Sequence, residues 1–360
     1  MATFNAVFEG GGAKGIVFLG ALEAIEAHGH GFGQLVGTSA GAISATLVAA
    51  GYNAADVRAA MSERTVQGKP VFSTFMDHPT IAAFPPELRQ NSRLLQSLEG
   101  LKLPGLPDLG GGLFSLVKRG TGGAVQDALL GLPLFRQLCL LVERGGVFSG
   151  DVFVDWMGAK LAAKGLDRDV TLADLATRAG RKLSLLATDT DNQRRLVLTA
   201  QSAPRLPVRW GVRMSMSIPF VWQEVLWRRE WGNYDGADAA GIRIVDGGLL
   251  SNFPIDLLPE GDSLLGLLID EKLPVAGQPA ERKKKQAIPE LATLTRVHRL
   301  LDTLLGARDN EHMRRLARFI CRLPAAGYDT LEFDMDHQRR DDLVAAGRAA
   351  MEAHLASRFS

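Results

Sequence analysis

The sequence predicts an α/β fold of three layers, in which helices cover both faces of a mostly parallel central sheet. The prediction rests first on two strand–glycine turn–helix units near the start of the chain. In the first unit a strand at 3–8 precedes a helix at 16–27, and in the second a strand at 34–38 precedes a helix at 42–50. Units of this kind in succession build a parallel sheet that is covered by helices. With 360 residues, 46% of them hydrophobic, the chain is also long and apolar enough to bury such a core.

The rest of the chain continues to alternate between apolar strands and helical patterns. We expect the following helices: 56–61, 126–143, 149–163, 204–217 and 339–354. We expect the following strands: 182–188, 195–199, 242–245, 264–269 and 330–333. A polar stretch at 272–289 leads into further helices, which we expect to extend to about residue 322.

The stretch 70–123 departs from this alternation, because prolines and glycine clusters break regular structure there. Apolar residues such as Phe72 and Phe84 remain frequent in it. We predict an inserted, lid-like region, and a loop region packed on the core is the alternative. The expected domain organisation is a catalytic domain at 1–270 that contains this insertion, followed by a helical C-terminal extension at 271–360 packed on it.

Charge and cysteine content exclude several classes of protein. Lys and Arg number 41 against 40 Asp and Glu, so nothing in the overall charge favours a nucleic-acid partner, and we expect none. The two cysteines, Cys139 and Cys321, are too few for a disulfide framework or a four-thiolate metal site. Both lie in runs that look helical, and we expect buried thiols.

The sequence shows no segment that would direct or anchor the chain. Its first residues have neither the basic nor the apolar region of a signal peptide. No apolar stretch reaches the ~18 residues that a membrane span requires. We therefore expect a protein that is cytoplasmic, or exported without a cleaved signal peptide, and that contacts membranes only at their surface.

A glycine-rich loop, Gly10-Gly11-Gly12-Ala13-Lys14-Gly15, follows the first strand. It matches the dinucleotide-binding pattern G-x-G-x-x-G, which also needs an acidic residue about 20 positions later. The stretch 29–37 contains no Asp or Glu, so the sequence disfavours a nucleotide site. The loop still indicates backbone N–H groups directed at an electron-rich group.

The second glycine turn has the pattern of a nucleophile elbow, Gly37-x-Ser39-x-Gly41. Small residues are needed there because the turn from strand to helix is tight and neighbouring backbone passes close to it. The helix behind Ser39 adds the positive end of its dipole, which favours developing negative charge. The pattern predicts that Ser39 is a nucleophile.

A serine nucleophile needs a base and an oxyanion stabiliser. Four late histidines lie in polar surroundings that are typical of solvated side chains: His298, His312, His337 and His354. Asp246 fits a base better, because it ends an apolar strand and is followed by Gly247 and Gly248. Taken alone, a turn-forming aspartate explains Asp246 equally well.

Together, the three motifs resemble the patatin-like phospholipase family in identity, order and context. Other segments of the chain are also similar to that family: 186–189 to its central strand, 215–220 to its S-x-S-x-P segment, and 252–254 to the N-x-P after its D-G-G. The resemblance implies the patatin-like α/β/α fold and a Ser–Asp dyad of Ser39 and Asp246 without histidine.

The resemblance also implies an oxyanion hole in the glycine-rich loop. The donors we expect are backbone amides from this set: Gly10, Gly11, Gly12 and Ala40. The residues expected to support the motifs are the following: Lys14, Gly15, Gly37, Gly41, Gly247 and Gly248. Lys14 has two interpretations, a positive charge for a phosphate-bearing substrate or a lysine on a helix surface.

The implied activity is lipid acyl hydrolysis of the phospholipase A or lysophospholipase type, through an acyl-enzyme intermediate. Asp246 would take the Ser39 proton, and burial would raise its pKa from about 3.9 and make it a stronger base. No metal or other cofactor is expected, and the expected partners are a phospholipid or other acyl-ester lipid and, transiently, a membrane surface.

Three further possibilities stay open: a lipid-binding protein without turnover, an effector that is inactive until a protein partner activates it, and a homo-oligomer. The intact serine, aspartate and glycine loop argue against the first.

Overall fold

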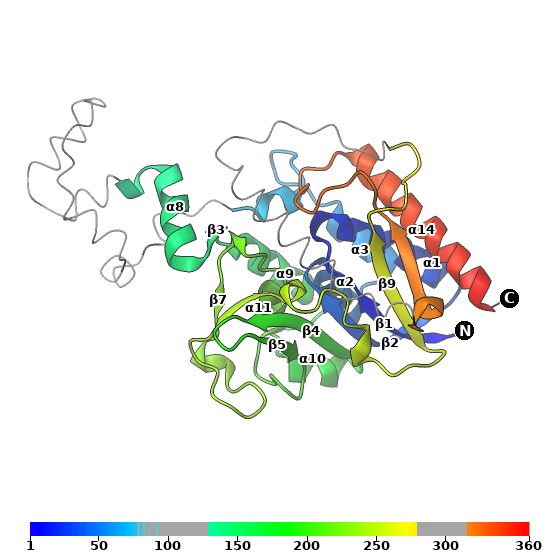
Figure 1. Cartoon of the computed structure of the whole chain (residues 1–360), viewed down its shortest axis with the longest axis horizontal. Coiled ribbons are helices and arrows are strands. Elements are labelled where there is room, and N and C mark those ends of the chain that lie inside the picture. Colours follow the sequence, from blue (N-terminus) through cyan, green and yellow to red (C-terminus); the bar gives the residue numbers. More distant parts are fainter. Residues whose placement is uncertain (78–79, 81–83, 85–91, 93–128, 279–314, 360) are drawn as a thin grey trace, which may run out of the picture. The chain divides into compact units, whose positions relative to one another are not determined.

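The described part of the protein is built around a sheet of mostly parallel strands (Figure 1). A computed structural model describes residues 1–77, 80, 84, 92, 129–278 and 315–359. The main sheet has eight strands: β1 (Thr3–Phe8), β2 (Gly31–Thr38), β4 (Lys182–Asp189), β5 (Arg194–Leu198), β7 (Val225–Leu226), β8 (Arg243–Asp246), β9 (Leu264–Asp270) and β10 (Ile320–Pro324). Their order is β10-β9-β1-β2-β4-β8-β7, and β5 pairs with β4 outside this path. All neighbours from β10 to β4 are parallel, whereas β5, β7 and β8 pair antiparallel. The predicted α/β fold with a mostly parallel sheet is confirmed.

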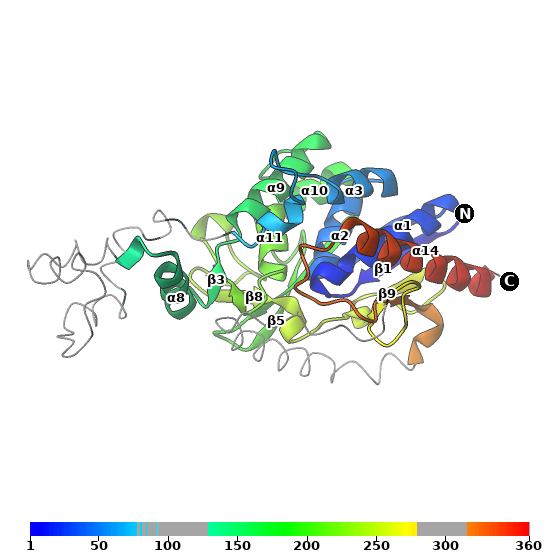
Figure 2. The ribbon, with the colours of Figure 1, turned by 90° about the horizontal axis from the view of Figure 1, so that it is seen from above.

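The strands β1 and β2 are each followed by a helix, as the strand–glycine turn–helix pattern predicted. Among the described residues, the α-helices are α1 (Val17–Ala27), α2 (Ala40–Ala49), α3 (Ala54–Met61), α8 (Pro133–Arg144), α9 (Asp151–Ala163), α10 (Leu172–Ala179), α11 (Val208–Ser215) and α14 (His337–Phe359). Short 3-10 helices include η1 (Gly12–Ile16), η2 (Val71–Thr74), η4 (Arg229–Trp231), η5 (Gly247–Leu249), η6 (Ile255–Leu257) and η8 (Ala317–Phe319). The C-terminal helix α14 packs along α1, as both ribbon views show (Figures 1 and 2). In the described part of the chain, no helix combines the length and apolar character that a membrane span needs.

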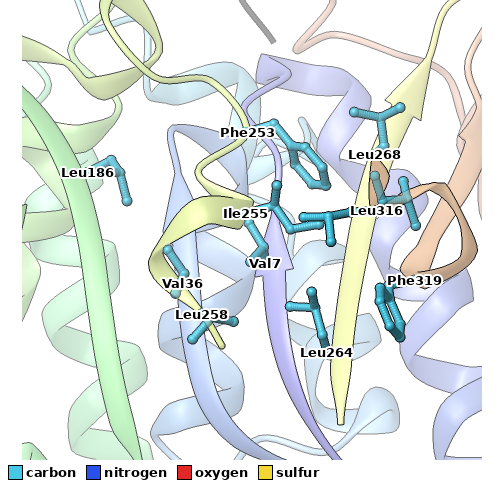
Figure 3. Packing of buried hydrophobic residues seen from close by; sticks show 11 residues of the cluster. Val7, Val36, Leu186, Phe253, Ile255, Leu258, Leu264, Leu268, Leu316 and Phe319 are labelled. Atoms are coloured by element: carbon cyan, nitrogen blue, oxygen red, sulfur yellow. The ribbon is translucent and has the colours of Figure 1, made fainter. Parts of the chain in front are cut away.

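Side chains on both faces of β1 are buried in the main sheet. Successive side chains of a strand point to opposite faces, and β1 shows this alternation. The Phe8 ring packs edge-on against Phe18 of α1 at 5.4 Å between ring centroids, whereas Val7 belongs to an apolar cluster on the other face. In that cluster, residues of η6 and η8 cover sheet residues (Figure 3). Its buried members are Val7, Val36, Leu186, Phe253, Ile255, Leu258, Leu264, Leu268, Leu316, Phe319 and Ile320.

The C-terminal part is more than a set of helices. Residues near 320 were expected to end a helix, but they form β10, which pairs in parallel with β9. The expectation that Cys321 lies in a helical run is therefore wrong, although both cysteines are buried as expected. The strand expected at 330–333 is also absent, because these described residues form turns.

The chain forms two compact units. The larger comprises Met1–Phe75, Phe153–Ile218 and Val225–Ser360, and the smaller comprises Met76–Val152 and Pro219–Glu224. In the smaller unit, β3 (Gly146–Phe148) pairs in parallel with β6 (Phe220–Trp222). Most of the predicted insertion at 70–123, and the helices expected after residue 279, lie outside the described residues.

Candidate active site

Ser39 occupies the tight turn between β2 and α2, in the larger unit. Its backbone angles, φ 51° and ψ −121°, belong to a region that residues with a side chain rarely adopt. Strained backbone of this kind persists where the surrounding structure holds it, and it concentrates at functional sites. The side chain is buried, with 5% of its surface exposed. The turn has the geometry that the Gly37–Gly41 pattern predicted.

The positions around Ser39 require glycine because other parts of the backbone or a neighbouring methyl group lie too close for a side chain. A Cβ atom on Gly41 would lie 2.2 Å from the carbonyl oxygen of Phe8, and one on Gly37 would lie 2.4 Å from that of Gly41. A Cβ atom on Gly15 would lie 2.6 Å from the Ala40 methyl group. Glycine at these positions therefore lets the start of α2 press against the end of β1 and against the glycine-rich loop.

The register of the sheet brings Asp246 to the level of Ser39. Strand β4 lies between β2 and β8, and its residues Leu186 and Ala187 pair with Thr38 and Asp246, respectively. The residue after Thr38 and the last residue of β8 are thus at the same height on the two sides of β4. A Cβ atom on Gly247 would lie 2.3 Å from the carbonyl oxygen of Leu186, so only glycine permits this approach after Asp246.

The Asp246 carboxyl is buried, with 5% of the residue exposed. Its Oδ1 accepts a hydrogen bond of 2.7 Å from the Gly248 amide, whereas Oδ2 has no hydrogen-bond partner of regular geometry among the described residues. Burial raises the pKa of Asp246 to about 7, although the nearby Ser39 hydroxyl and the Gly248 amide act to lower it. The site thus holds a carboxyl with a free oxygen beside a serine hydroxyl, poised to exchange a proton near neutral pH.

One segment at the C-terminal end of α11 anchors both of these residues. The backbone amide of Ser39 donates to Ser215 Oγ at 3.0 Å, and the backbone amide of Asp246 donates to the Ser217 carbonyl at 2.9 Å. The Ser217 hydroxyl in turn donates to the Arg213 carbonyl at 2.6 Å. The sequence marked this S-x-S segment only by family resemblance, and the S-x-S spacing is the signal that could have indicated its role.

The glycine-rich loop and the elbow together present backbone amides that form no hydrogen bond within the described residues. The Gly10 amide donates to the Asn252 carbonyl at 3.1 Å, so it is already engaged. In the described structure, the amides of Gly11, Gly12 and Ala40 donate to no other group. Gly12 has φ 55°, and a Cβ atom there would lie 2.2 Å from the Thr330 carbonyl oxygen. The loop conformation thus depends on glycine at position 12.

Lys14 is buried rather than on a helix surface, with 4% of its surface exposed. Its Nζ forms an ion pair with Glu271, whose side chain is 65% exposed. The interpretation as a surface lysine is therefore wrong. Lys14 ties the loop, through η1, to the residue that follows β9.

The remaining candidates lie apart from this arrangement or outside the described residues. His337 and His354 both belong to α14, where His337 is exposed and His354 is half-buried. Burial lowers the pKa of His354, so it is not a simple solvated histidine. His298 and His312 are not in the described part. Across the described residues, no group of three or more His, Cys, Asp or Glu side chains is arranged to hold a metal ion.

This chain is similar to a known protein family and to known proteins. A family model described as "Patatin-like phospholipase" matches residues 6–259. The "Uncharacterized protein YqhO" of Bacillus subtilis (strain 168) is 27% identical over 363 residues, which cover 98% of this chain and 97% of YqhO. The crystal structure of VipD from Legionella pneumophila is similar in fold, with a TM-score of 0.50 at 15% identity over 99% of this chain and 67% of VipD. Because the family model covers more than half of the chain, from β1 through the strand that ends in Asp246, this protein belongs to the patatin-like phospholipase family.

Proposed function

We propose that this protein hydrolyses acyl esters of phospholipids or lysophospholipids, with Ser39 as the nucleophile and Asp246 as the general base. Family membership supports lipid hydrolysis in general. The observation that carries the specific mechanism is the buried Asp246 carboxyl beside the Ser39 hydroxyl, with a pKa of about 7 and an oxygen that has no other partner among the described residues.

In the first half of the reaction, Ser39 Oγ attacks the ester carbonyl and Asp246 accepts the hydroxyl proton. A carboxylate of ordinary pKa, about 3.9, is a weak base for a serine hydroxyl. The raised pKa of Asp246 brings it into the range where general-base catalysis near neutral pH is effective. Collapse of the tetrahedral intermediate breaks the ester bond, the proton passes from Asp246 to the leaving alcohol, and Ser39 keeps the acyl group.

In the second half, water attacks the acyl-enzyme. Asp246 takes a proton from this water and returns it to Ser39 Oγ as the acyl–serine bond breaks. The products are a fatty acid and the regenerated dyad. Every proton is accounted for by Asp246, so histidine has no role in the proposed cycle.

The amides of Gly11, Gly12 and Ala40 are the proposed oxyanion donors. They make no other hydrogen bond among the described residues, whereas the Gly10 amide is engaged by Asn252. Loss of one donor of this kind typically lowers the rate by about 10²–10³-fold. Lys14, which pairs with Glu271, is proposed to hold the loop that carries the Gly11 and Gly12 donors rather than to contact the substrate first.

The test compares the wild type with Ser39→Ala and Asp246→Asn on a soluble fluorogenic acyl ester and on a defined phospholipid mixture. Ser62→Ala and Asp155→Asn serve as matched controls, because Ser62 and Asp155 are exposed. We expect both dyad variants to lose on the order of 10³-fold or more in kcat, because removing one member of a catalytic unit removes most of the contribution of the whole unit. Mass spectrometry of the products identifies the preferred headgroup and ester position. Wild-type rates in both dyad variants would overturn the proposal.

A fluorophosphonate probe separates the remaining possibilities. We expect it to label the wild type at Ser39 and to leave Ser39→Ala unlabelled. Labelling without turnover on any lipid would indicate an effector that needs an activating partner. Tight lipid binding without labelling would indicate a lipid-binding protein.

A further inference from the structure

We propose that Asn252 and Glu9 form a positioning pair that holds the glycine-rich loop in register with the catalytic dyad. This inference rests on the proposed function, because it concerns the same site. Neither side chain belongs to the dyad or to the oxyanion donors. Both stand where three parts of the fold meet: the end of β1, the end of β9 and the turn after η5.

Asn252 forms hydrogen bonds with both backbone polar groups of Gly10. The Asn252 carbonyl accepts the Gly10 amide at 3.1 Å, and Asn252 Nδ2 donates to the Gly10 carbonyl, also at 3.1 Å. The same Nδ2 donates to Glu9 Oε1 at 3.2 Å. Nδ2 faces two acceptors, the Gly10 carbonyl oxygen and Glu9 Oε1. The arrangement therefore requires a side chain that donates hydrogen bonds at this point, as the amide of Asn252 does.

Glu9 fixes this contact to the sheet. Its Oε2 accepts the Ile269 amide of β9 at 2.6 Å, and its own amide donates to the Leu267 carbonyl at 3.2 Å. The two carboxylate oxygens therefore serve two different donors, one on β9 and one on Asn252. A carboxylate that bridges backbone and side-chain donors forms stronger hydrogen bonds than a neutral acceptor does.

The Asn252 carboxamide also borders the dyad. A Cβ atom placed on Gly10 would lie 2.2 Å from Asn252 Oδ1 and 3.3 Å from Ser39 Cβ. A Cβ atom placed on Gly248 would lie 2.9 Å from Asn252 Oδ1 and 3.0 Å from Asp246 Oδ1. Asn252 Oδ1 thus fills the space between the loop, Ser39 and the turn that begins at Asp246.

The consequence is kinetic, because two of the proposed oxyanion donors, Gly11 and Gly12, directly follow Gly10. Displacement of catalytic groups by about 1 Å lowers rates by on the order of 10²-fold. Loosening the loop should reduce stabilisation of the transition state more than substrate binding, and so it should lower kcat with little change in KM.

The test uses Glu9→Gln, Asn252→Asp and the double variant Glu9→Gln/Asn252→Asp. Glu9→Gln leaves one acceptor oxygen at position 9 for two donors, Asn252 Nδ2 and the Ile269 amide. Asn252→Asp places a carboxylate opposite two acceptors, the Gly10 carbonyl and Glu9 Oε1. In the double variant, the new amide at position 9 can donate to the new carboxylate at position 252 and still accept from Ile269. Asn5→Asp is the matched control, because Asn5 bonds Gln34 and Ser263 near the start of β1, far along the strand from Gly10.

We expect each single variant to lose about 10–100-fold in kcat per fluorophosphonate-titrated site, with KM within about twofold of the wild type. The double variant should recover at least about threefold in kcat over Asn252→Asp alone, because the two positions are coupled. Asn252→Asp should also move the pH profile of kcat/KM to higher pH, since its new charge lies beside Asp246. Asn5→Asp should keep the wild-type kcat.

The outcomes separate this inference from the proposed function. If Ser39→Ala and Asp246→Asn are inactive but both single variants keep kcat within about twofold of the wild type, the positioning pair is wrong and the dyad stands. If the total activity of a variant falls only as far as its number of probe-labelled active sites falls, Glu9 and Asn252 affect folding alone and the inference also fails. Wild-type activity in the dyad variants would instead overturn the proposed function itself.

Discussion

The backbone amide of Ser39 donates a hydrogen bond of 3.0 Å to the hydroxyl of Ser215. Two residues later, the Ser217 carbonyl accepts the amide of Asp246. A single short segment therefore sets the position of the proposed nucleophile, Ser39, against that of the proposed base, Asp246, although the two come from opposite ends of the family-matched region. Ser215 is fully buried, so this hydrogen bond has no competition from bulk water.

Ser215→Ala should lower kcat by about 10-fold and leave KM nearly unchanged. The change leaves the buried Ser39 amide without a hydrogen-bond acceptor, and an unsatisfied buried donor typically costs about 1–3 kcal/mol. Steady-state kinetics on a soluble ester, with active sites counted by the fluorophosphonate probe, would measure the effect. The exposed Ser62→Ala is the control, and an unchanged kcat in Ser215→Ala would show that this hydrogen bond does not position the nucleophile.

The activity should rise with pH until Asp246 is ionised. Because the proposed base form is the carboxylate and burial raises the pKa of Asp246 to about 7, kcat/KM should increase about tenfold per pH unit below 7 and level off above it. A carboxyl of ordinary pKa would give a flat profile from about pH 5 upward. Measurement between pH 5 and 9 on a soluble ester decides between the two profiles.

Asp246→Asn should stabilise the protein at alkaline pH. The folded protein holds the Asp246 proton up to about pH 7, whereas the unfolded chain releases it near 3.8. The folded state thus binds more protons over that range, and the free energy of unfolding contributed by this group falls as pH rises through it. At about 1.4 kcal/mol per pKa unit, the loss reaches at most about 4 kcal/mol above pH 7.

Urea unfolding of the wild type and Asp246→Asn at pH 4, 6 and 8 tests this expectation. The difference in free energy of unfolding should be small at pH 4 and should grow in favour of the variant at pH 8. Asp155→Asn, at an exposed position, should show no such trend. A pH-independent difference would mean that the Asp246 carboxyl is not destabilised by burial.

Ser39→Gly should be more stable than Ser39→Ala by about 1–2 kcal/mol, although both should be inactive. Alanine keeps a Cβ atom in the strained conformation at φ 51°, whereas glycine adopts positive φ without that strain. The opposite order would be expected of a residue in ordinary helix, where glycine is less favourable than alanine. Thermal or chemical unfolding of the two variants measures the difference directly.

Much of the site could be predicted from the sequence because its elements are local. The elbow at 37–41 and the strands that end at Phe8 and Thr38 follow from glycine spacing and apolar runs, and the structure has them at those places. The strand β10 was missed because its five residues include Arg322 and Pro324 and have no strand pattern of their own. It becomes a strand through pairing with β9, where Arg322 Nε also bonds Asp270 at 2.7 Å.

The sequence by itself determined the order of the motifs, the kinds of residue in them and the family that they resemble. Only the tertiary structure decided that Ser39 and Asp246 lie on the two sides of β4 at one height, that Ser215 and Ser217 hold both catalytic candidates, and that the Gly10 amide is already engaged. The reason is physical. Turns and strands depend on neighbouring residues, whereas register, burial and a raised pKa depend on contacts between segments that are distant in the chain.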